Sequence, residues 1–401
     1  RLHLYPYAMV TNESTSPRAI AFVVNQIRPQ GPLFVVRDIV AGLPEGYYKP
    51  YIIQLCSLEP QGEAMADELQ AMGCEIIELG FTRGQLELFP RSAARMLDEC
   101  LQHYDITLVH SHTYQPDIVT SYLTHRYILL TTQHNIAKLD FTYGKGRLLG
   151  SYMCRHLMRA LSRHREVVCV SHVCRDYYRK SLPTKVNVYV APNGIDNVLF
   201  TPPDSSSERA QLRRQLDLPE LGYIITYCGS LIKRKDPELI LRALRRLKKR
   251  RQLPSDLRLL ILGKGPLERR CKQLAKPLGE QVQFVGFTDR VADYLGASDA
   301  LITASHAEGL PLNVIEGVAS GCVVIHSNLP IFGEILESVP QMAALRFDLG
   351  NVSQCADCIL KAPSVTFDRQ EALKMGRLYG RQRMALQYHR IYQQLLRKYL
   401  G

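Results

Sequence analysis

The stretch Ser305-His306-Ala307-Glu308-Gly309-Leu310-Pro311-Leu312-Asn313-Val314-Ile315-Glu316-Gly317 decides how the rest of the chain is interpreted. It follows an apolar run, residues 300–304, that is typical of a buried parallel strand, and it leads into a helix that Gly321 closes. Glu308 then lies in the strand-to-helix turn, and Glu316 lies about two turns into the helix on the same side. The free N–H groups between them favour an anion. On spacing alone, a helix that merely contains two glutamates is the favoured interpretation.

The composition indicates a globular protein of two domains with an anionic partner. The chain has 401 residues, of which 46% are hydrophobic and 22% are charged, and its formal net charge is +12. This length exceeds that of most single domains, and the positive charge favours a nucleotide, an acidic lipid surface or a nucleic acid as partner. No apolar run approaches the roughly 20 residues of a membrane span.

The eleven cysteines lie in apolar stretches such as residues 167–170 and 226–228. Scattered cysteines of this kind indicate buried thiols in a reducing compartment, and we therefore expect a cytoplasmic protein without a disulfide framework. Cys355 and Cys358 are spaced like a redox pair, but packing within a helix is the favoured interpretation.

Strands and helices alternate through the first half of the chain. Apolar runs predict strands at residues 20–26, 51–56, 75–79, 107–110, 128–132, 167–170 and 186–190, with amphipathic helices at 33–43, 64–72 and 91–103. This order predicts an α/β fold with a parallel sheet that is covered by helices on both faces.

A second series follows a polar break at residues 201–207. It predicts strands at 223–228, 257–262, 282–285, 300–304 and 322–326, and helices at 237–251 and 267–278. We therefore expect two facing doubly wound, Rossmann-like domains, residues 1–200 and 201–376. A long basic helix, residues 377–401, is expected to cross back onto the first domain.

Candidate site residues follow the strands of both halves, because ligands of open parallel sheets bind at the carboxyl ends of strands. After the strand that ends at Cys228, Gly229 permits a tight turn and Ser230 offers a hydroxyl. The cations of residues 233–235 could clamp a diphosphate before the next helix. A solvated basic loop is an equally good interpretation of the same residues.

Three further residues are weaker candidates. Gly263 and Phe287 follow the next two strands and could frame a nucleotide base, although turn chemistry alone explains each of them. His134 ends a strand of the first half and could bind a sugar hydroxyl, with a structural histidine as the alternative. The spacing of the histidines and aspartates does not predict a metal site.

Taken in order along the chain, these motifs resemble a retaining glycosyltransferase of family 4 with the two-domain GT-B architecture. The matching segments are residues 105–112, 131–134, 168–171, 192–196 with Phe200, 229–235, 262–265, 285–287, and 308–316 with Gly321. The resemblance covers nearly the whole chain. Its most specific parts are the Glu308-to-Glu316 element and the run Pro192-Asn193-Gly194-Ile195-Asp196.

The resemblance implies roles for individual residues. Glu308 would contact the donor sugar, Glu316 the ribose hydroxyls and Lys235 the donor diphosphate. His134 would lie near the reacting sugar, so that Glu308, His134 and Lys235 form the implied catalytic set. The backbone of Gly309, Leu310, Pro311 and Leu312 would lie near the sugar and the phosphate.

The chain departs from the family pattern at two places. Ser230 stands where the family often has an arginine, and Lys233 or Arg234 would have to replace that cation. Only Gly31 remains of the glycine-rich turn of the first domain.

The implied reaction moves a sugar from a nucleotide-sugar donor, with UDP favoured, to a glycan or lipid-linked acceptor, without a metal or other cofactor. The alternatives are a sugar-nucleotide epimerase or a phosphorylase on the same architecture. A basic nucleic-acid-binding protein is disfavoured because no aromatic platform or recognition helix accompanies the charge.

Two basic helices, residues 242–251 and 147–165, suggest peripheral contact with the inner face of an anionic membrane. In the second helix, Leu157, Met158 and Leu161 form an apolar stripe. The alternative, favoured for both helices, is that the apolar stripes pack on the sheet while the charges face water.

Overall fold

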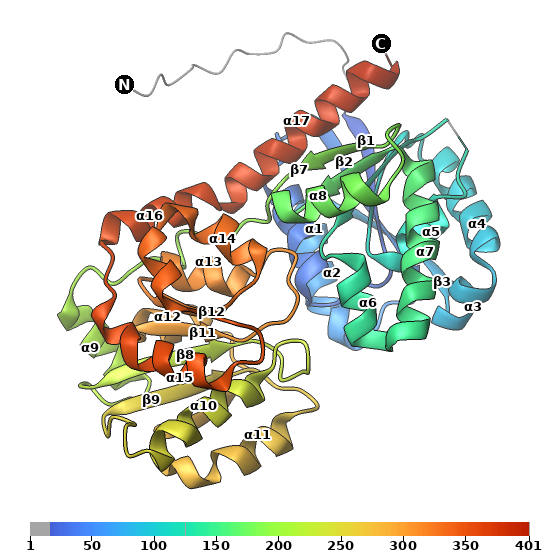
Figure 1. Cartoon of the computed structure of the whole chain (residues 1–401). Helices are drawn as coiled ribbons and strands as arrows, with labels where there is room; N and C mark the ends of the chain where they lie inside the picture. Colours follow the sequence, from blue (N-terminus) through green and yellow to red (C-terminus); the bar gives the residue numbers. More distant parts are fainter. Residues whose placement is uncertain (1–16, 125, 401) are drawn as a thin grey trace. The chain divides into compact units, whose positions relative to one another are not determined.

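The computed structural model describes residues 17–124 and 126–400, and it contains two sheets (Figure 1). The seven-stranded sheet has the order β3-β2-β1-β4-β5-β6-β7, and the six-stranded sheet has the order β10-β9-β8-β11-β12-β13. The strand pairs of both sheets are parallel, with helices between the strands. The predicted α/β fold with two doubly wound sheets is confirmed.

The first sheet and its helices come from the first half of the chain. Its strands are β1 (Arg18–Val24), β2 (Tyr48–Cys56), β3 (Glu75–Phe81), β4 (Leu108–His112), β5 (Ile128–Gln133), β6 (Glu166–Cys169) and β7 (Asn187–Val190). Its helices are α1 (Gly31–Ala41), α2 (Glu63–Ala71), α3 (Arg83–Leu88), α4 (Pro90–His103), α5 (Tyr114–Thr120), α6 (Ala137–Lys145), α7 (Arg147–His164) and α8 (His172–Ser181).

The second sheet and its helices come from the second half. Its strands are β8 (Tyr223–Cys228), β9 (Leu257–Leu262), β10 (Val282–Gly286), β11 (Ala300–Thr303), β12 (Val323–Ser327) and β13 (Arg346–Phe347). The helices are α9 (Ser206–Gln215), α10 (Pro237–Lys249), α11 (Glu268–Ala275), α12 (Val291–Ala297), α13 (Leu312–Ala319), α14 (Pro330–Ile335), α15 (Val352–Lys361), α16 (Arg369–Leu378) and α17 (Arg381–Leu400).

The chain divides into two compact units, Arg1–Leu129 with Gln393–Gly401 and Leu130–Tyr392. The core of the first unit gathers buried side chains of β1, β2 and α4, such as Val23, Ile53 and Leu97. The larger core of the second unit is built on the second sheet, around Ile302, Ile325 and Phe332. The boundary expected at residue 200 stays a prediction.

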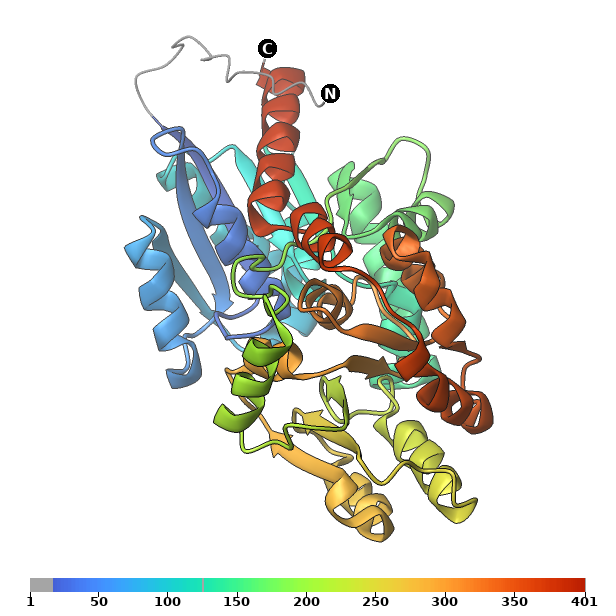
Figure 2. The ribbon, with the colours of Figure 1, turned by 90° about the vertical axis from the view of Figure 1, so that its left-hand side faces the viewer.

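The second sheet is buried on both faces, because successive residues of its central strands enter different clusters. Ile225 of β8 and Ile261 of β9 face the core that α10 and α11 cover, whereas Ile224 and Leu260 face a smaller cluster beside α9 and α12. Figures 1 and 2 show α9 and α10 on opposite sides of the strands. Such two-sided burial is why the strands are continuously apolar in the sequence.

The predicted continuous helix from Arg377 is wrong, since the chain leaves helical geometry between α16 and α17. There Ile195 pairs with this break: its N–H donates to the oxygen of Tyr379 (2.7 Å), and its oxygen accepts from the N–H of Arg381 (3.0 Å). A Cβ on Gly194 would overlap the backbone of Arg381. The Gly194-Ile195 pair of the sequence motif therefore permits a close backbone crossing.

α17 begins directly after this crossing and extends to Leu400. The hydroxyl of Tyr388 lies 2.9 Å from the hydroxyl of Thr132 in β5. Among the helices built from residues 17–124 and 126–400, none is both long and apolar enough to span a bilayer.

Candidate active site

The site is built on two loops that the strand order places next to each other. β8 lies between β9 and β11, so the direction of winding reverses between β8 and β11. At such a point, a crevice separates the loops that follow the two strands, and ligands bind in that crevice. Here the loops are residues 229–236 after β8 and 304–311 after β11.

Backbone and side-chain contacts of Arg234 and Asp236 join these loops. The oxygen of Arg234 accepts from the N–H of His306 (2.8 Å), and the guanidinium of Arg234 donates to the oxygen of Ala307 (2.6 Å). The His306 ring Nε2 lies 2.9 Å from a carboxylate oxygen of Asp236. The two loops therefore form one structure, although 70 residues separate His306 from Asp236.

Asp236 caps the start of α10, directly after Arg234 and Lys235. Its φ of 43° is left-handed, a conformation that aspartate tolerates better than most residues. Its carboxylate accepts from the N–H of Leu239 (3.2 Å), and Pro237 occupies the first helical position. Arg234 and Lys235 consequently precede a capped helix start.

Glu308 is the centre of the site's charge network. Its side chain is 7% exposed; one carboxylate oxygen contacts the Lys235 ammonium, and the other lies 3.2 Å from the Arg234 guanidinium. Burial alone would raise the pKa of Glu308, but the charges of Lys235 and Arg234 hold this pKa below its ordinary value. The carboxylate is therefore ionised and carries two cations beside it.

The N-terminus of α13 follows directly. α13 begins at Leu312 after Pro311, and the side chain of Pro311 makes no capping hydrogen bond. The Asn313 side chain donates to the oxygen of Cys228 (2.8 Å), which ties this first turn to the end of β8. Uncapped N–H groups at a helix start favour an anion.

Glu316 lies one turn further along α13. Burial raises the pKa of Glu316 to about 7. Burial also raises the pKa of the Cys228 thiol to about 12, with a further contribution from the charge of Glu316. The Glu316 carboxylate therefore lies near the end of β8, on the side of α13 that carries Asn313.

Gly309 joins this structure to the loops that follow β5 and β6. Its N–H donates to the Asn135 side chain (3.1 Å), and its oxygen accepts from the Ser171 hydroxyl (2.8 Å). A Cβ at position 309 would overlap the backbone oxygen of His134. Only glycine fits this crossing, and three of the sequence motifs meet at it.

His134 is brought to the same place by its backbone. Burial lowers the pKa of its imidazole to about 4, so the ring is neutral at pH 7. A neutral imidazole can donate or accept a hydrogen bond, and its proposed place beside the reacting sugar stays a prediction.

The glycines that end β8, β9 and β10 pack together. The N–H of Gly229 donates to the oxygen of Leu262 (2.9 Å), and the N–H of Gly263 donates to the oxygen of Gly286 (2.7 Å). A Cβ at position 263 would overlap the oxygen of Gly229. Gly263 therefore permits the close approach of these strand ends, and its expected place at a nucleotide base stays a prediction.

Ser230, Phe287 and Gly31 lie at the surface, whereas Leu310 and Pro311 are buried. Ser230 and Lys233 are exposed, and Phe287 is 82% exposed. Of the two cations named as replacements for the missing arginine, Arg234 contacts Glu308 and Lys233 faces solvent. Gly31 starts α1 in the first unit, is exposed, and has Pro32 after it.

Several site residues were given no role from the sequence. Asn135, Asn313 and Asp140 hold the loops through side-chain contacts, and Asp140 lies 3.8 Å from Arg234. Ser171 belonged to a quoted motif, but its bond to Gly309 was not foreseen. In the region that the structure describes, no group of three or more His, Cys, Asp or Glu side chains is placed to hold a metal ion.

Two family models match the chain. The model of the glycosyl transferases group 1 matches residues 208–359, and the model of glycosyltransferase family 4 matches residues 34–199. Among curated relatives, the O-antigen biosynthesis glycosyltransferase WclY of Escherichia coli is 24% identical over 398 residues, which cover 95% of this chain and 99% of the relative. A D-inositol 3-phosphate glycosyltransferase of Salinispora tropica is 29% identical over 66% of this chain and 56% of that protein.

Solved structures share the fold over nearly the whole chain. HepE of Anabaena, in complex with UDP, superposes with a TM-score of 0.73 at 16% identity and covers 94% of this chain and 99% of that one. Sucrose-phosphate synthase of Thermosynechococcus elongatus gives a TM-score of 0.74 at 20% identity, over 95% of this chain and 100% of that one. Because the two family models match adjoining segments in the expected order and the fold is shared throughout, this protein belongs to the family 4, group 1 type of glycosyltransferases with the GT-B fold.

Proposed function

We propose that this enzyme transfers a sugar from a nucleotide-sugar donor to a glycan or lipid-linked acceptor, with retention of anomeric configuration and without a metal ion. The observation that carries the proposal is the contact of buried Glu308 with the partly buried Lys235 and Arg234, beside the N-terminus of α13. A nucleotide sugar presents hydroxyls and a diphosphate, which are the groups that carboxylates and cations with free N–H groups recognise.

The charge of each group indicates which part of the donor it would bind. Lys235, Arg234 and the first N–H groups of α13 would take the diphosphate, whose negative charge grows as the sugar leaves. Glu308 is ionised and would accept hydroxyl hydrogen bonds from the donor sugar. Glu316, further along α13, would accept from the ribose hydroxyls. Fixed cations at the leaving group supply the stabilisation that a metal supplies elsewhere, which supports the metal-independent reaction.

Retention follows, in this proposal, from attack on the face that the diphosphate leaves. The leaving phosphate would take the proton of the acceptor hydroxyl, while a new bond forms to the sugar carbon and the bond to the phosphate breaks through an oxocarbenium-like transition state. Neutral His134 could hold a sugar hydroxyl by a hydrogen bond while this charge develops.

UDP is the favoured donor nucleotide. The Glu308-Gly309-Leu310-Pro311 sequence resembles that of UDP-sugar users, and HepE of Anabaena has structures with UDP, with UDP and glucose, and with UDP-glucose. A thermal-shift panel of UDP, GDP and ADP sugars tests this, because a ligand that binds only the folded state raises the melting temperature. A larger shift with a GDP or ADP sugar would refute the choice of base.

Substitution of Glu308 tests the site itself. We expect Glu308→Gln to lower sugar transfer by about a hundredfold or more, because the amide cannot hold Lys235 and Arg234 by charge while it binds the sugar. Glu337→Gln, an exposed glutamate of the same unit, is the matched control and should retain activity. Full activity in Glu308→Gln would contradict the assignment of Glu308 to the donor sugar.

Glu316→Ala separates donor binding from catalysis. We expect it mainly to weaken donor affinity, since the ribose lies away from the reacting bond; unchanged donor affinity would contradict the role.

The products distinguish the remaining alternatives: interconversion of nucleotide sugars without release of nucleotide indicates an epimerase, and phosphate-dependent breakdown of a glucan indicates a phosphorylase. We also propose a cytoplasmic location with peripheral contact at an anionic membrane.

A further inference from the structure

The end of α6 and the start of α7 expose large apolar side chains. Leu148 is 91% exposed, Tyr152 61%, Leu149 51% and Tyr143 43%. Single exposed apolar residues are normal on a protein surface, but these four lie within residues 143–152. A cluster of this kind is typical of a surface that meets a partner or a membrane.

Cations share this surface, and acids are scarce on it. Lys145, Arg147, Arg155 and Arg159 are all exposed, and the sequence of α7 contains no aspartate or glutamate. Leu148, Tyr152, Arg155 and Arg159 follow one another at helical spacings of three or four and therefore share one face of α7. The single acidic residue of α6, Asp140, lies 3.8 Å from Arg234 of the site.

The opposite face of α7 is inside the protein. Leu157 and Leu161, which the sequence offered as a lipid-facing stripe, are 2% and 0% exposed. The alternative interpretation, in which that stripe packs, is therefore confirmed for these two residues. The exposed apolar set is a different one, nearer the start of the helix.

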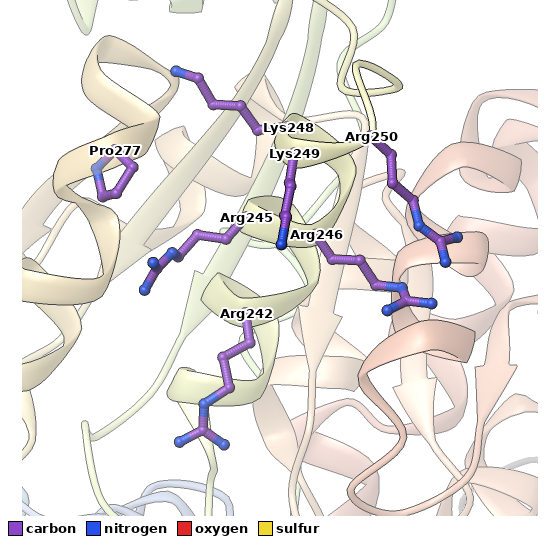
Figure 3. A pocket seen from close by; sticks show the side chains of 7 residues that line it. All are labelled: Arg242, Arg245, Arg246, Lys248, Lys249, Arg250 and Pro277. Atoms are coloured by element: carbon purple, nitrogen blue, oxygen red, sulfur yellow. The ribbon is translucent and has the colours of Figure 1, made fainter.

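The second basic helix provides a contrast. An open groove along α10 is lined by Arg242, Arg245, Arg246, Lys248, Lys249, Arg250 and Pro277. Figure 3 shows Arg245 and Lys248 extending on the side of Pro277, and Arg246 and Arg250 extending on the other side, so the charges do not converge on one point. The leucines of α10 are buried, so this face offers charge alone, which salt screens.

We propose that the α6–α7 surface, residues 143–159, docks this protein on an anionic lipid bilayer. Anionic headgroups complement the cations, and the side chains of Leu148, Leu149 and Tyr152 can enter the boundary between headgroups and acyl chains. A soluble polyanion would satisfy the cations but would leave Leu148 and Tyr152 in water. The combination therefore favours a bilayer as the occupant.

Docking here also bears on the active site. The α6 residues Asp140 and Tyr143 face the donor loops: Asp140 lies near Arg234, and the Tyr143 ring lies 5.9 Å from the His306 ring. If the proposed function is correct, a lipid-linked acceptor in the same bilayer is thereby held beside the loops that bind the donor. The docking itself does not depend on that function.

Vesicle co-sedimentation of the full chain tests the proposal, with phosphatidylcholine vesicles that contain or lack phosphatidylglycerol. We expect binding only to the vesicles with phosphatidylglycerol, and partial binding that persists at high salt because the apolar contacts are not screened. Leu148→Ser with Tyr152→Ser should lower the bound fraction by about tenfold, since two large apolar side chains are lost from the interface. Arg155→Ser with Arg159→Ser should lower binding at low salt and change little at high salt.

Two controls locate the surface. Leu221→Ser removes a leucine that is 86% exposed elsewhere and should bind like the wild type. Arg245→Ser with Lys248→Ser removes charge from the α10 groove and should have a smaller effect than either pair in α7. The proposal fails if the wild type ignores phosphatidylglycerol, if the Leu148 and Tyr152 pair binds like the wild type, or if only the α10 pair loses binding. The vesicles contain neither donor nor acceptor, so these outcomes are independent of the catalytic proposal.

Discussion

Burial and neighbouring charges set the pKa values of single residues in this protein. Glu308 and Glu316 lie on one loop and helix, yet their pKa values move in opposite directions. Lys235 and Arg234 offset the burial of Glu308, whereas burial alone governs Glu316. The first carboxylate is ready to hold a cation or a hydroxyl, and the second is poised to change charge near neutral pH.

The raised pKa of Glu316 predicts how stability depends on pH. Between the ordinary value of 4.5 and the folded value of about 7, only the folded protein keeps this proton, so the free energy of unfolding falls as the pH rises through this range. Glu316→Gln is neutral at every pH. We expect it to match the wild type at pH below about 4.5 and to exceed it above pH 7 by up to about 3 kcal/mol.

Thermal unfolding of both proteins without ligand, at acidic and at neutral pH, measures this difference. Glu337→Gln is the control for loss of an exposed carboxylate, and its effect should not vary over the same range. A Glu316→Gln effect that is equal at both pH values would show that this carboxylate is not held neutral by burial.

At the scale of elements, Gly309 joins the loop after β11 to those after β5 and β6. Gly309→Ala places a Cβ into the backbone of His134, which is not a flexible side-chain end, so the loop must move. We expect a loss of about 1–3 kcal/mol in the free energy of unfolding and a loss of transfer activity.

Gly333→Ala is the matched control for that change. Gly333 lies within α14, and a Cβ there would meet no atom within 4 Å. Alanine favours a helix over glycine by about 0.5–1 kcal/mol, so this variant should be at least as stable as the wild type. Equal stability of Gly309→Ala and Gly333→Ala, measured by denaturant unfolding, would contradict the crossing at Gly309.

A second contact between elements joins α14 to the start of α8. The two carboxylate oxygens of Glu334 in α14 accept from the N–H groups of His172 and Val173, each at 2.9 Å. Ser171 occupies the N-cap of the same helix and also donates to Gly309. A carboxylate at a helix N-terminus satisfies donors that the helix leaves free and interacts favourably with the helix dipole.

Glu334→Ala should therefore lower the free energy of unfolding by about 1–2 kcal/mol. Glu337→Ala, which removes the same charge three positions later, should have little effect. Chemical denaturation of the two variants measures the difference, and equal midpoints would show that the α8 cap contributes nothing.

At the scale of the molecule, α17 is held by residues far away in the sequence. Tyr388 is fully buried, and its hydroxyl meets Thr132 across 256 positions of the chain. We expect Tyr388→Ala to lower the free energy of unfolding by about 3–5 kcal/mol, through loss of buried area and the cavity that remains. Tyr388→Phe keeps the ring and should cost only about 1 kcal/mol.

Equilibrium unfolding of both variants separates the ring from the hydroxyl. His389→Ala provides a control on the neighbouring position of the same helix, where the side chain is less buried. If Tyr388→Ala were no more destabilising than His389→Ala, α17 would not depend on this anchor.

The sequence by itself determined the α/β class, the approximate positions of most strands, and the turn between β11 and α13 that carries Glu308. These features follow from local periodicity and from glycine and proline, which act over a few residues. It also predicted ligand contacts for Lys235 and Glu316, whose individual roles were implied by resemblance to a family and stay predictions.

The tertiary structure alone decided which of these residues meet. Arg234, rather than Lys233, turns to Glu308 because the Asp236 cap and the bond from His306 orient the loop after β8. The predicted helix from Arg377 is broken because Ile195 binds its backbone, and α7 exposes Leu148 rather than Leu157 because the latter packs inside. Each outcome depends on contacts between segments tens to hundreds of positions apart, and the periodicity of a single segment carries no information about its distant partner.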